Sequence, residues 1–298
     1  MKIFGRTSSK RRSRSRADVV GRLGLLLFVG IAILPIAFSL LYAVAYSFGA
    51  IGLLSEGVTL TFWQRLFETS EVWYSFGLSI YVAAATVVAT ASFSLFFALF
   101  LNRPLQYGPL SYIIYFPLAL PATVAAFLVF QVFSGAGYGA RVLLNLGLIS
   151  DISQFPNLVN DPYAIGIILA HVGLAVPFFT LLFVQVYNTE RVKDLTNLAQ
   201  TLGASPRQAL YRVAAPILLT KSFTNIVLLF IAVLGSYEIP LLLGRQAPQM
   251  LSVLTMRKYA MFDITEKPEA FIVAVLYTLV VLTLIIVAFR KGRLAYDH

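Results

Sequence analysis

The chain has 298 residues, of which 59% are hydrophobic and only 12% are charged, and its formal net charge is +10. With a mean hydropathy of +0.82, it is too apolar for a water-soluble domain, and we expect an integral membrane protein. The absence of cysteine excludes disulfides and cysteine metal sites, and the presence of only two histidines argues against a metalloenzyme. We therefore expect no metal site in this chain.

The first 22 residues form a strongly basic segment. They hold eight Lys and Arg residues against the single acid Asp18. Such a run can bind nucleic acid, but next to a membrane span it is typical of a cytoplasmic flank. We predict a basic cytoplasmic tail over 1–22 and no nucleic-acid partner.

Six apolar segments follow, and each is long enough for the roughly 20 residues that a membrane-spanning helix needs. They predict an all-α integral membrane fold with six transmembrane helices in a domain over 23–289, followed by a short tail over 290–298. The predicted spans are 23–48, 72–101, 109–133, 163–187, 222–243 and 269–289.

Two of these spans carry residues that are unusual in a plain lipid-facing helix. Pro117 and Pro121 interrupt the third span, and prolines at membrane depth are tolerated where a cavity or neighbouring helices satisfy the freed backbone groups. The third span is therefore expected to be interior or to line a pathway. His171 in the fourth span is interpreted as a packing histidine, with a proton relay as the alternative. Between spans, short helices are expected around 62–67 and over 142–149.

The distribution of basic residues predicts the orientation. If the N-terminus is inside, the inside segments hold seventeen Lys and Arg residues and the outside segments hold six. Cytoplasmic loops are enriched in these residues, so both termini and the polar loop over 188–221 are predicted to be cytoplasmic.

The polar loop over 188–221 is the longest interruption between spans and carries an ordered pattern. Its first half, 193–202, predicts a short helix because apolar residues recur at helical spacing. This stripe consists of Leu195, Leu198, Ala199 and Leu202.

A glycine elbow follows this first helix. Gly203 stops it, and Ser205 is a suitable N-cap for a second helix with Pro206 at the first helical position. Gln208 three residues after the serine completes a capping box. The loop is therefore predicted to be a helix, an elbow and a second helix.

This layout resembles the cytoplasmic signature of permease subunits of bacterial ABC importers that work with a substrate-binding protein. The glycine-to-proline spacing is that of the family, and the positions that match are Ala199, Gly203, Val213 and Pro216. The sequence departs from the family pattern at three positions, namely Asn197, Leu198 and Ala215. The alternative is an amphipathic connector that lies on the lipid.

The resemblance implies a type I ABC importer permease fold in which the loop docks in a groove of the ATP-hydrolysing subunit. It assigns this coupling role to Asp194, Leu195, Asn197, Leu198, Ala199, Leu202, Gly203, Ala204 and Arg207. It also implies three kinds of protein partner: two ATP-binding subunits, a second permease chain that is expected to be different from this one, and a periplasmic or extracellular substrate-binding protein. Membrane lipid surrounds the chain, and the expected location is the bacterial plasma (inner) membrane.

The chain is not expected to hydrolyse ATP itself. A phosphate-binding P-loop needs a Gly-Lys-Ser/Thr run, and none of the seven lysines follows a glycine. We expect no cofactor on this chain, and ATP and Mg²⁺ belong to the partner ATPase. An ATP-independent secondary transporter or channel remains the alternative, although such proteins typically carry several intramembrane charges or an inverted repeat.

Glu238 is the only acidic residue in the interior of a predicted span, and a charge at that depth is expected to face a cavity or a partner. Pro240, Gly235 and Gly244 can unwind the helix around it. We predict a substrate pathway formed by Ser236, Tyr237, Glu238, Pro117 and Pro121. The alternative is that Glu238 is hydrated or pairs with Arg245 or another basic residue.

The stretch over 235–244 resembles permeases of the polyamine, ferric iron and sulfate group. An anionic Glu238 in the pathway favours a small cationic substrate such as a polyamine. The sequence therefore predicts the translocation subunit of an ATP-driven importer.

Overall fold

The computed structural model describes residues 21–52, 57–101 and 114–296. Within them the chain is helical and no strand is present. The predicted basic tail, apart from its last two residues, lies outside the described residues, as do the start of the third predicted span and the last two residues of the C-terminal tail.

The helical elements in the described part of the chain range from 3 to 31 residues in length. A helix over Gly21–Ser47 contains a π-helical segment and the α-helix α2. The elements are η1 Val29–Ile33, α2 Leu34–Ser47, α3 Thr61–Glu68, α4 Ser70–Phe100, η2 Phe116–Ala119, α7 Ala122–Phe133, α8 Tyr138–Asn145, η3 Ile152–Gln154, α9 Ile165–Thr189, α10 Val192–Thr201, α11 Pro206–Ala209, η4 Leu210–Ala214, α12 Ala215–Lys221, α13 Phe223–Leu234, α14 Glu238–Leu243, α15 Leu251–Ala260 and α16 Glu266–Tyr296.

Five stretches are long and apolar enough to cross a membrane, or six if the bent pair of 206–221 and 223–234 counts as one span. This confirms the predicted all-α membrane fold. The first, second, fourth and sixth predicted spans correspond to single long helices with bounds within a few residues. The short helix expected around 62–67 is α3, and the one expected over 142–149 is α8, which begins four residues earlier.

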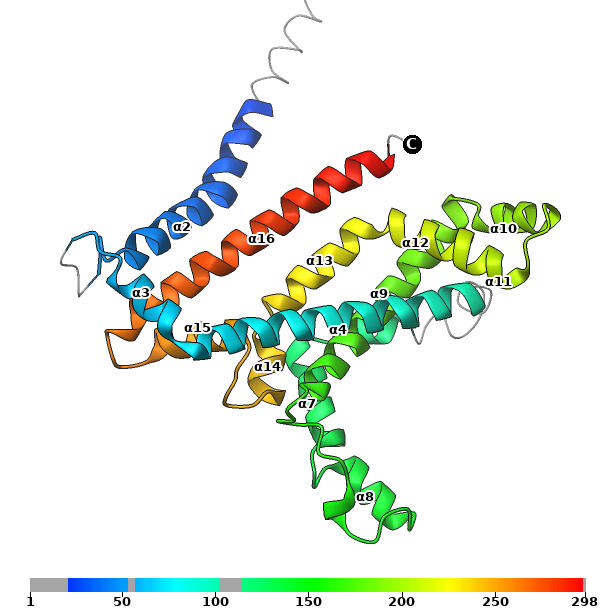
Figure 1. Cartoon of the computed structure of the whole chain (residues 1–298), viewed down its shortest axis with the longest axis horizontal. Coiled ribbons are helices and arrows are strands. Elements are labelled where there is room, and N and C mark those ends of the chain that lie inside the picture. Colours follow the sequence, from blue (N-terminus) through cyan, green and yellow to red (C-terminus); the bar gives the residue numbers. More distant parts are fainter. Residues whose placement is uncertain (1–20, 53–56, 102–113, 297–298) are drawn as a thin grey trace, which may run out of the picture.

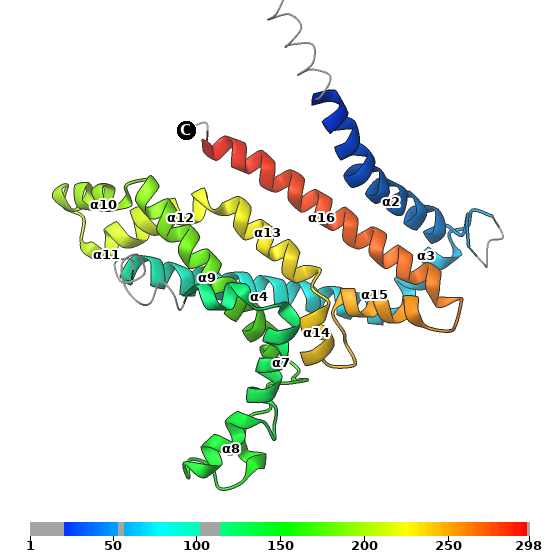
Figure 2. The same ribbon diagram turned by 180° about the vertical axis from the view of Figure 1, so that it is seen from behind.

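The helices α10 and α11 lie at the same end of the molecule as the C-terminal end of α16, while α3 and α15 lie at the opposite end (Figures 1 and 2). Next to α7, α8 and its flanking loops project away from the other helices (Figure 1). The helices α2 and α16 run side by side in both views and contact one another. The predicted polar loop and the predicted C-terminal tail therefore share one end of the bundle.

The centre of the bundle is the pair formed by α4 and α9. One face of α4 presents small side chains that are all fully buried, and small residues of this kind let neighbouring helices approach closely. These residues are Ser75, Ser79, Ala83, Thr86, Thr90 and Ser94. The hydroxyl of Ser94 donates a hydrogen bond to the carbonyl of Val176 in α9 at 3.2 Å.

The predicted fifth span, 222–243, is not one helix. α12 and α13 meet at Ser222 with a bend of 60°. α13 ends at Leu234, and three residues, 235–237, separate it from α14. The predicted unwinding next to Glu238 is present, while Pro240 lies in the first turn of α14, where its missing N–H leaves no helical bond unmade. The break falls at 235–237, where the Tyr277 hydroxyl of α16 packs so closely on Gly235 that a Cβ there would lie 2.1 Å from it.

The third predicted span, 109–133, is also divided. In its described part, η2 is separated from α7 by Leu120 and Pro121, both with extended backbone. Pro121 is the residue before α7, so it delimits a helix rather than kinking one. The apolar stretch that is long enough to cross the membrane runs from Ala122 to Asn145 and includes α8.

Gly166 in α9 offers a test of the packing between an outer loop and the bundle. A Cβ at this position would lie 2.2 Å from the Leu158 carbonyl oxygen, whereas a Cβ at Gly173 in the same helix would meet nothing within 4 Å. Gly166→Ala should therefore destabilise the protein by about 1–3 kcal/mol through overpacking. Gly173→Ala should be neutral or stabilising by up to about 1 kcal/mol because it removes helix-interior flexibility.

Thermal unfolding in detergent, followed by size-exclusion chromatography, measures both variants. Equal unfolding temperatures for the two would contradict this packing of Gly166 against the loop.

Candidate functional site

The polar loop over 188–221 has the local structure that its sequence predicts. α10 is followed by Gly203 in a left-handed conformation, with φ of 96°. The Ser205 side chain accepts from the Gln208 backbone N–H, and the Gln208 side chain accepts from the Ser205 backbone N–H, which is a complete capping box. The predicted helix, elbow and second helix are confirmed, with α10 starting and ending one residue earlier than expected.

The base of this loop is fixed to the bundle. Val192, at the start of α10, is fully buried in an apolar cluster with Phe183 of α9 and Leu218 of α12. Glu190 and Lys221 stand at the two ends of the loop, and their side chains form an ion pair of 3.4 Å. Because both side chains are partly exposed, this pair contributes at most about 1 kcal/mol.

The free side of α10 carries large apolar side chains. Leu195, Leu198 and Leu202 are 41%, 57% and 82% exposed, and Tyr211, which follows the second helix, is 72% exposed. A helix whose anchoring residue is buried and whose apolar stripe is exposed is typical of a surface that binds in a groove of a partner protein. The remaining predicted coupling residues are exposed or half-buried in the same loop: Asp194, Asn197, Ala199, Gly203, Ala204 and Arg207.

A cavity of about 700 Å³ lies between α9, α13, the start of α7 and the broken segment. Most of its wall is apolar or aromatic. Its polar residues come from three elements: His171 in α9, Asn225 in α13, and Ser236, Tyr237 and Glu238 at the break. This cavity therefore brings together three of the five residues that the sequence predicted for a substrate pathway.

Glu238 is the acidic centre of this cavity. It is exposed, and its carboxylate accepts a hydrogen bond of 2.6 Å from the Thr123 hydroxyl of α7. In the part of the chain that the structure describes, Glu238 forms no ion pair, so the alternative of pairing with Arg245 is not seen. Pro117 and Pro121 do not contribute to the wall, although Ala122, which follows Pro121, does.

His171 is buried, and its ring nitrogen Nδ1 lies 2.9 Å from the Ile167 carbonyl oxygen. A carbonyl only accepts, so this contact places the proton on Nδ1 and leaves Nε2 as an acceptor. Nε2 has no partner among the described residues. His171 thus makes the local bond expected of a packing histidine while its ring also forms part of the cavity wall.

Three residues of this site were missed by the sequence reasoning. Thr123 and Asn225 are ordinary polar residues in apolar helices, and His171 was interpreted as a packing histidine or a proton relay and was not assigned to the pathway. For Asn225 a signal existed, since an amide inside an apolar segment is costly and often faces a cavity. The contact between Thr123 and Glu238 joins residues far apart in the sequence, and only the tertiary structure shows it.

Several solved structures share the fold, including those of two bacterial ABC transporters. The chain is similar to one in the crystal structure of a bacterial alginate ABC transporter in complex with an alginate pentasaccharide-bound periplasmic protein, with a TM-score of 0.68 and 16% identity over 95% of this chain and 96% of that one. It is equally similar, with a TM-score of 0.68 and 16% identity over 95% and 97% of the two chains, to a chain of a bacterial ABC transporter involved in the import of the acidic polysaccharide alginate. No curated protein matches the sequence.

The sequence pattern of one family covers most of the chain. The family is described as the binding-protein-dependent transport system inner membrane component, and the match extends over residues 92–291, which include both the polar loop and the broken span. The several apolar helices agree with a multi-pass protein of the bacterial inner membrane. The chain therefore belongs to this family of inner membrane components, which are the permease subunits of binding-protein-dependent ABC importers.

Proposed function

We propose that this permease lines the translocation pathway with the cavity around Glu238, and that a separate ATPase subunit drives it through the polar loop over 188–221, which we call the coupling loop. The observation that carries this proposal is the coupling loop itself. Its capping box, glycine elbow and buried anchor hold α10 in place, while Leu195, Leu198 and Leu202 face away from the bundle.

The coupling loop also suits a mechanical role because it is continuous with the cavity. α12 leads from the loop into α13 through the bend at Ser222, and α13 ends at the break that carries Ser236 and Glu238. A displacement of α10 by a partner is therefore passed along two helices to the cavity wall. Nine residues form this proposed coupling surface: Asp194, Leu195, Asn197, Leu198, Ala199, Leu202, Gly203, Ala204 and Arg207.

The proposed assembly contains two ATP-binding subunits and a second permease, which we infer to be a different chain. ATP and Mg²⁺ bind to the ATPase subunits in this scheme. A periplasmic or extracellular binding protein delivers the substrate to the outer loops. The similar alginate transporter in complex with a periplasmic protein supports this last partner by its fold.

For the substrate we propose a small cation such as a polyamine. The cavity combines a carboxylate with aromatic side chains, including Tyr237, Phe178 and Phe179. Carboxylates and aromatic faces both attract ammonium groups. An acidic polysaccharide of the kind carried by the structurally similar transporters would meet repulsion from Glu238, so the similarity in fold does not extend in this proposal to the substrate.

The direct test is uptake into proteoliposomes that contain the native complex and its binding protein, with and without ATP. The proposal expects ATP-dependent accumulation of radiolabelled spermidine or putrescine and none of an alginate oligosaccharide. Accumulation without ATP would favour a secondary transporter, and ATP-driven uptake of alginate alone would contradict the cationic substrate.

Leu198→Glu tests the coupling surface. A charge at the centre of an apolar docking stripe should lower ATP-driven uptake by about tenfold or more, because central anchors of an interface contribute about 2 kcal/mol or more. Gln200→Glu, on the exposed opposite side of α10, is the matched control and should leave uptake unchanged. Membrane insertion, checked by the amount of chain in the membrane fraction, should be equal for both. Equal uptake by the two variants would contradict the docking role of the stripe.

Glu238→Gln tests the acidic centre of the cavity. Losing a hydrogen bond to a charged partner removes about 1.5–3 kcal/mol, so the apparent affinity for a polyamine should fall by about 10- to 100-fold. The control is Glu68→Gln, an exposed residue of α3 outside the cavity. Affinity is measured by concentration-dependent uptake. An unchanged polyamine affinity in Glu238→Gln would show that Glu238 does not bind the substrate in the pathway.

A further inference from the structure

The short helix α15 belongs neither to the wall of the larger cavity nor to the coupling loop. It lies between the broken span and α16, at the end of the bundle opposite α10 (Figure 1). Its residues Leu251 and Leu254 are buried in an apolar cluster with Val72 of α4 and Ile272 of α16. One helix is thus packed against two spans at once.

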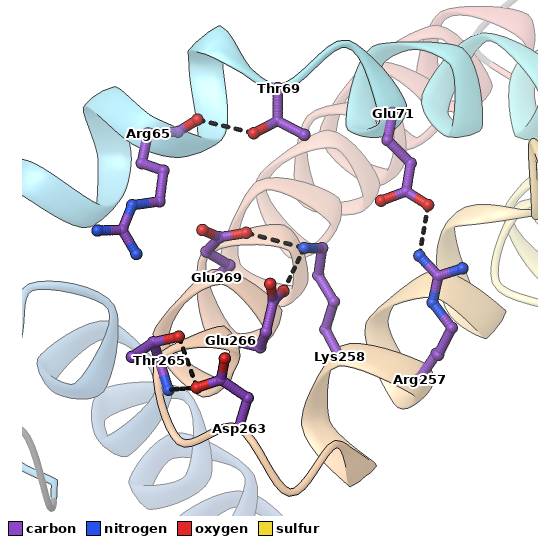
Figure 3. Close-up of polar contacts among 9 residues, drawn as sticks. All are labelled: Arg65, Thr69, Glu71, Arg257, Lys258, Asp263, Thr265, Glu266 and Glu269. Carbon is purple, nitrogen blue, oxygen red and sulfur yellow. Dashed lines mark hydrogen bonds and ion pairs between the residues drawn. The ribbon is translucent and has the colours of Figure 1, made fainter.

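The C-terminal end of α15 is fixed by charge. Lys258 is only 5% exposed, and its Nζ lies 2.5 Å from Glu266 and 2.8 Å from Glu269, the latter 4% exposed. Figure 3 shows the lysine reaching between these two carboxylates of α16. Burial acts to lower the pKa of Lys258, but its hydrogen bonds to the two glutamates outweigh burial and raise the pKa above the ordinary value. The lysine is therefore charged, and its position is fixed by its partners.

Arg257, the neighbour of Lys258, ties the same end of α15 to a second span. Its guanidinium donates to the carboxylate of Glu71, which stands in the first turn of α4 (Figure 3). The two adjacent basic residues therefore point to two different spans. The C-terminal end of α15 cannot move without disturbing the outer end of α4 or of α16.

The N-terminal end of α15 is fixed to the broken span. The Leu251 N–H donates to the Ser79 hydroxyl of α4 at 2.8 Å, and the Ser252 hydroxyl donates to the carbonyl of Ser236. Ser236 lies in the break between α13 and α14. A carbonyl freed by a break inside a membrane protein needs a partner, and Ser252 supplies it.

There is space beside the break for movement. A second cavity of about 390 Å³ lies between α15, α16 and the break, and its wall includes Ser252 and Tyr277. Tyr237 lines both this cavity and the larger one around Glu238. Tyr237 therefore adjoins both cavities, and the backbone carbonyl of the residue before it, Ser236, is the one that accepts from Ser252.

We propose that α15 is a strut that sets the position of the broken segment 235–237, with Ser252 and Lys258 as its positioning residues. Lys258 fixes the strut to α16, and Ser252 fixes the broken segment to the strut. A shift of the outer ends of the spans is thereby passed to Tyr237 and Glu238 in the cavity. The inference rests on the proposed function, since it takes this cavity as part of the transport pathway.

The natural absence of cysteine provides a reporter for this test. Ala232 is exposed and lines the larger cavity. In Ala232→Cys, the rate of alkylation by a membrane-impermeant maleimide is measured on this chain within the native complex in membrane vesicles. Each measurement is made without nucleotide and after trapping with ATP and vanadate, and the ratio of the two rates reports the movement of the cavity wall.

Ser252→Ala in this reporter background should change the ratio by about two- to tenfold, the range that corresponds to one lost hydrogen bond. The matched control is Thr283→Ala in α16, whose hydroxyl bonds only within its own helix, to the Leu279 carbonyl. This control should keep the ratio of the parent reporter. The proposed role of α15 would be overturned if the alkylation-rate ratio changed equally in both variants, or if it did not change in Ser252→Ala.

The role of Lys258 is tested with a variant that leaves no buried charge without a partner. Lys258→Gln would strand Glu269 and can simply unfold the protein, so the informative variant is the exchange Lys258→Glu with Glu269→Lys. The alkylation-rate ratio of the exchange variant should be closer to that of the parent reporter than the ratio of Lys258→Gln is. Thermal unfolding of each variant is measured as well. The positioning role of Lys258 would be contradicted if the exchange variant were as stable as the parent reporter and yet its alkylation-rate ratio were altered as much as that of Ser252→Ala.

The parent reporter, which carries only Ala232→Cys, distinguishes an incorrect strut proposal from an incorrect proposed function. If its alkylation does not respond to ATP and vanadate, the proposed ATP-driven function fails, and the strut fails with it. If the parent responds and Ser252→Ala responds identically, the strut alone is overturned.

Discussion

A helix that stops within a membrane must give its freed N–H and C=O groups new partners, and the break at 235–237 is where this constraint acts on the permease. The carbonyl of Ser236 is satisfied from α15 by Ser252, and Glu238, the first residue after the break, is held by Thr123 of α7. The missing side chain of Gly235 lets Tyr277 of α16 pack directly on the turn. Three different elements thus hold one short irregular segment.

The same segment connects the two functional regions. On one side α13 leads back through the bend at Ser222 to the coupling loop, whose ends are joined by Glu190 and Lys221. On the other side α15 leads to the outer ends of α4 and α16. In the proposed mechanism, motions from both ends of the bundle would therefore reach the cavity around Glu238.

The coupling loop was predictable from the sequence because its signals are local. A capping box, a glycine with positive φ and an apolar stripe at helical spacing each depend on neighbours within a few residues, and they predicted α10 to within one residue and the start of α11. The helical type of the spans followed equally directly from hydropathy, although in the described part of the chain five stretches are long enough to cross a membrane, or six if the bent pair counts as one span. For the same reason Ser236, Tyr237 and Glu238 were recognised as a group, since they adjoin one another in an otherwise apolar segment.

The remaining features depended on contacts between distant residues. The hydroxyl of Tyr277 packs directly on Gly235 at the break, a contact that hydropathy cannot predict. Arg257 and Lys258 were counted as charges of an outer loop, yet Lys258 is buried between two glutamates. Pro117 and Pro121 were assigned to the pathway on account of their depth, and the cavity wall passes beside them through Ala122.

The central claim is that a separate ATPase drives this chain through the coupling loop. The most direct measurement is purification of the chain from its native membrane in mild detergent, with identification of the bound proteins and an assay of ATP hydrolysis. We expect recovery of a P-loop ATPase and a second six-span permease, with vanadate-sensitive hydrolysis in the same fraction. Recovery of the chain alone or only with copies of itself, together with solute movement in vesicles without ATP, would contradict the claim.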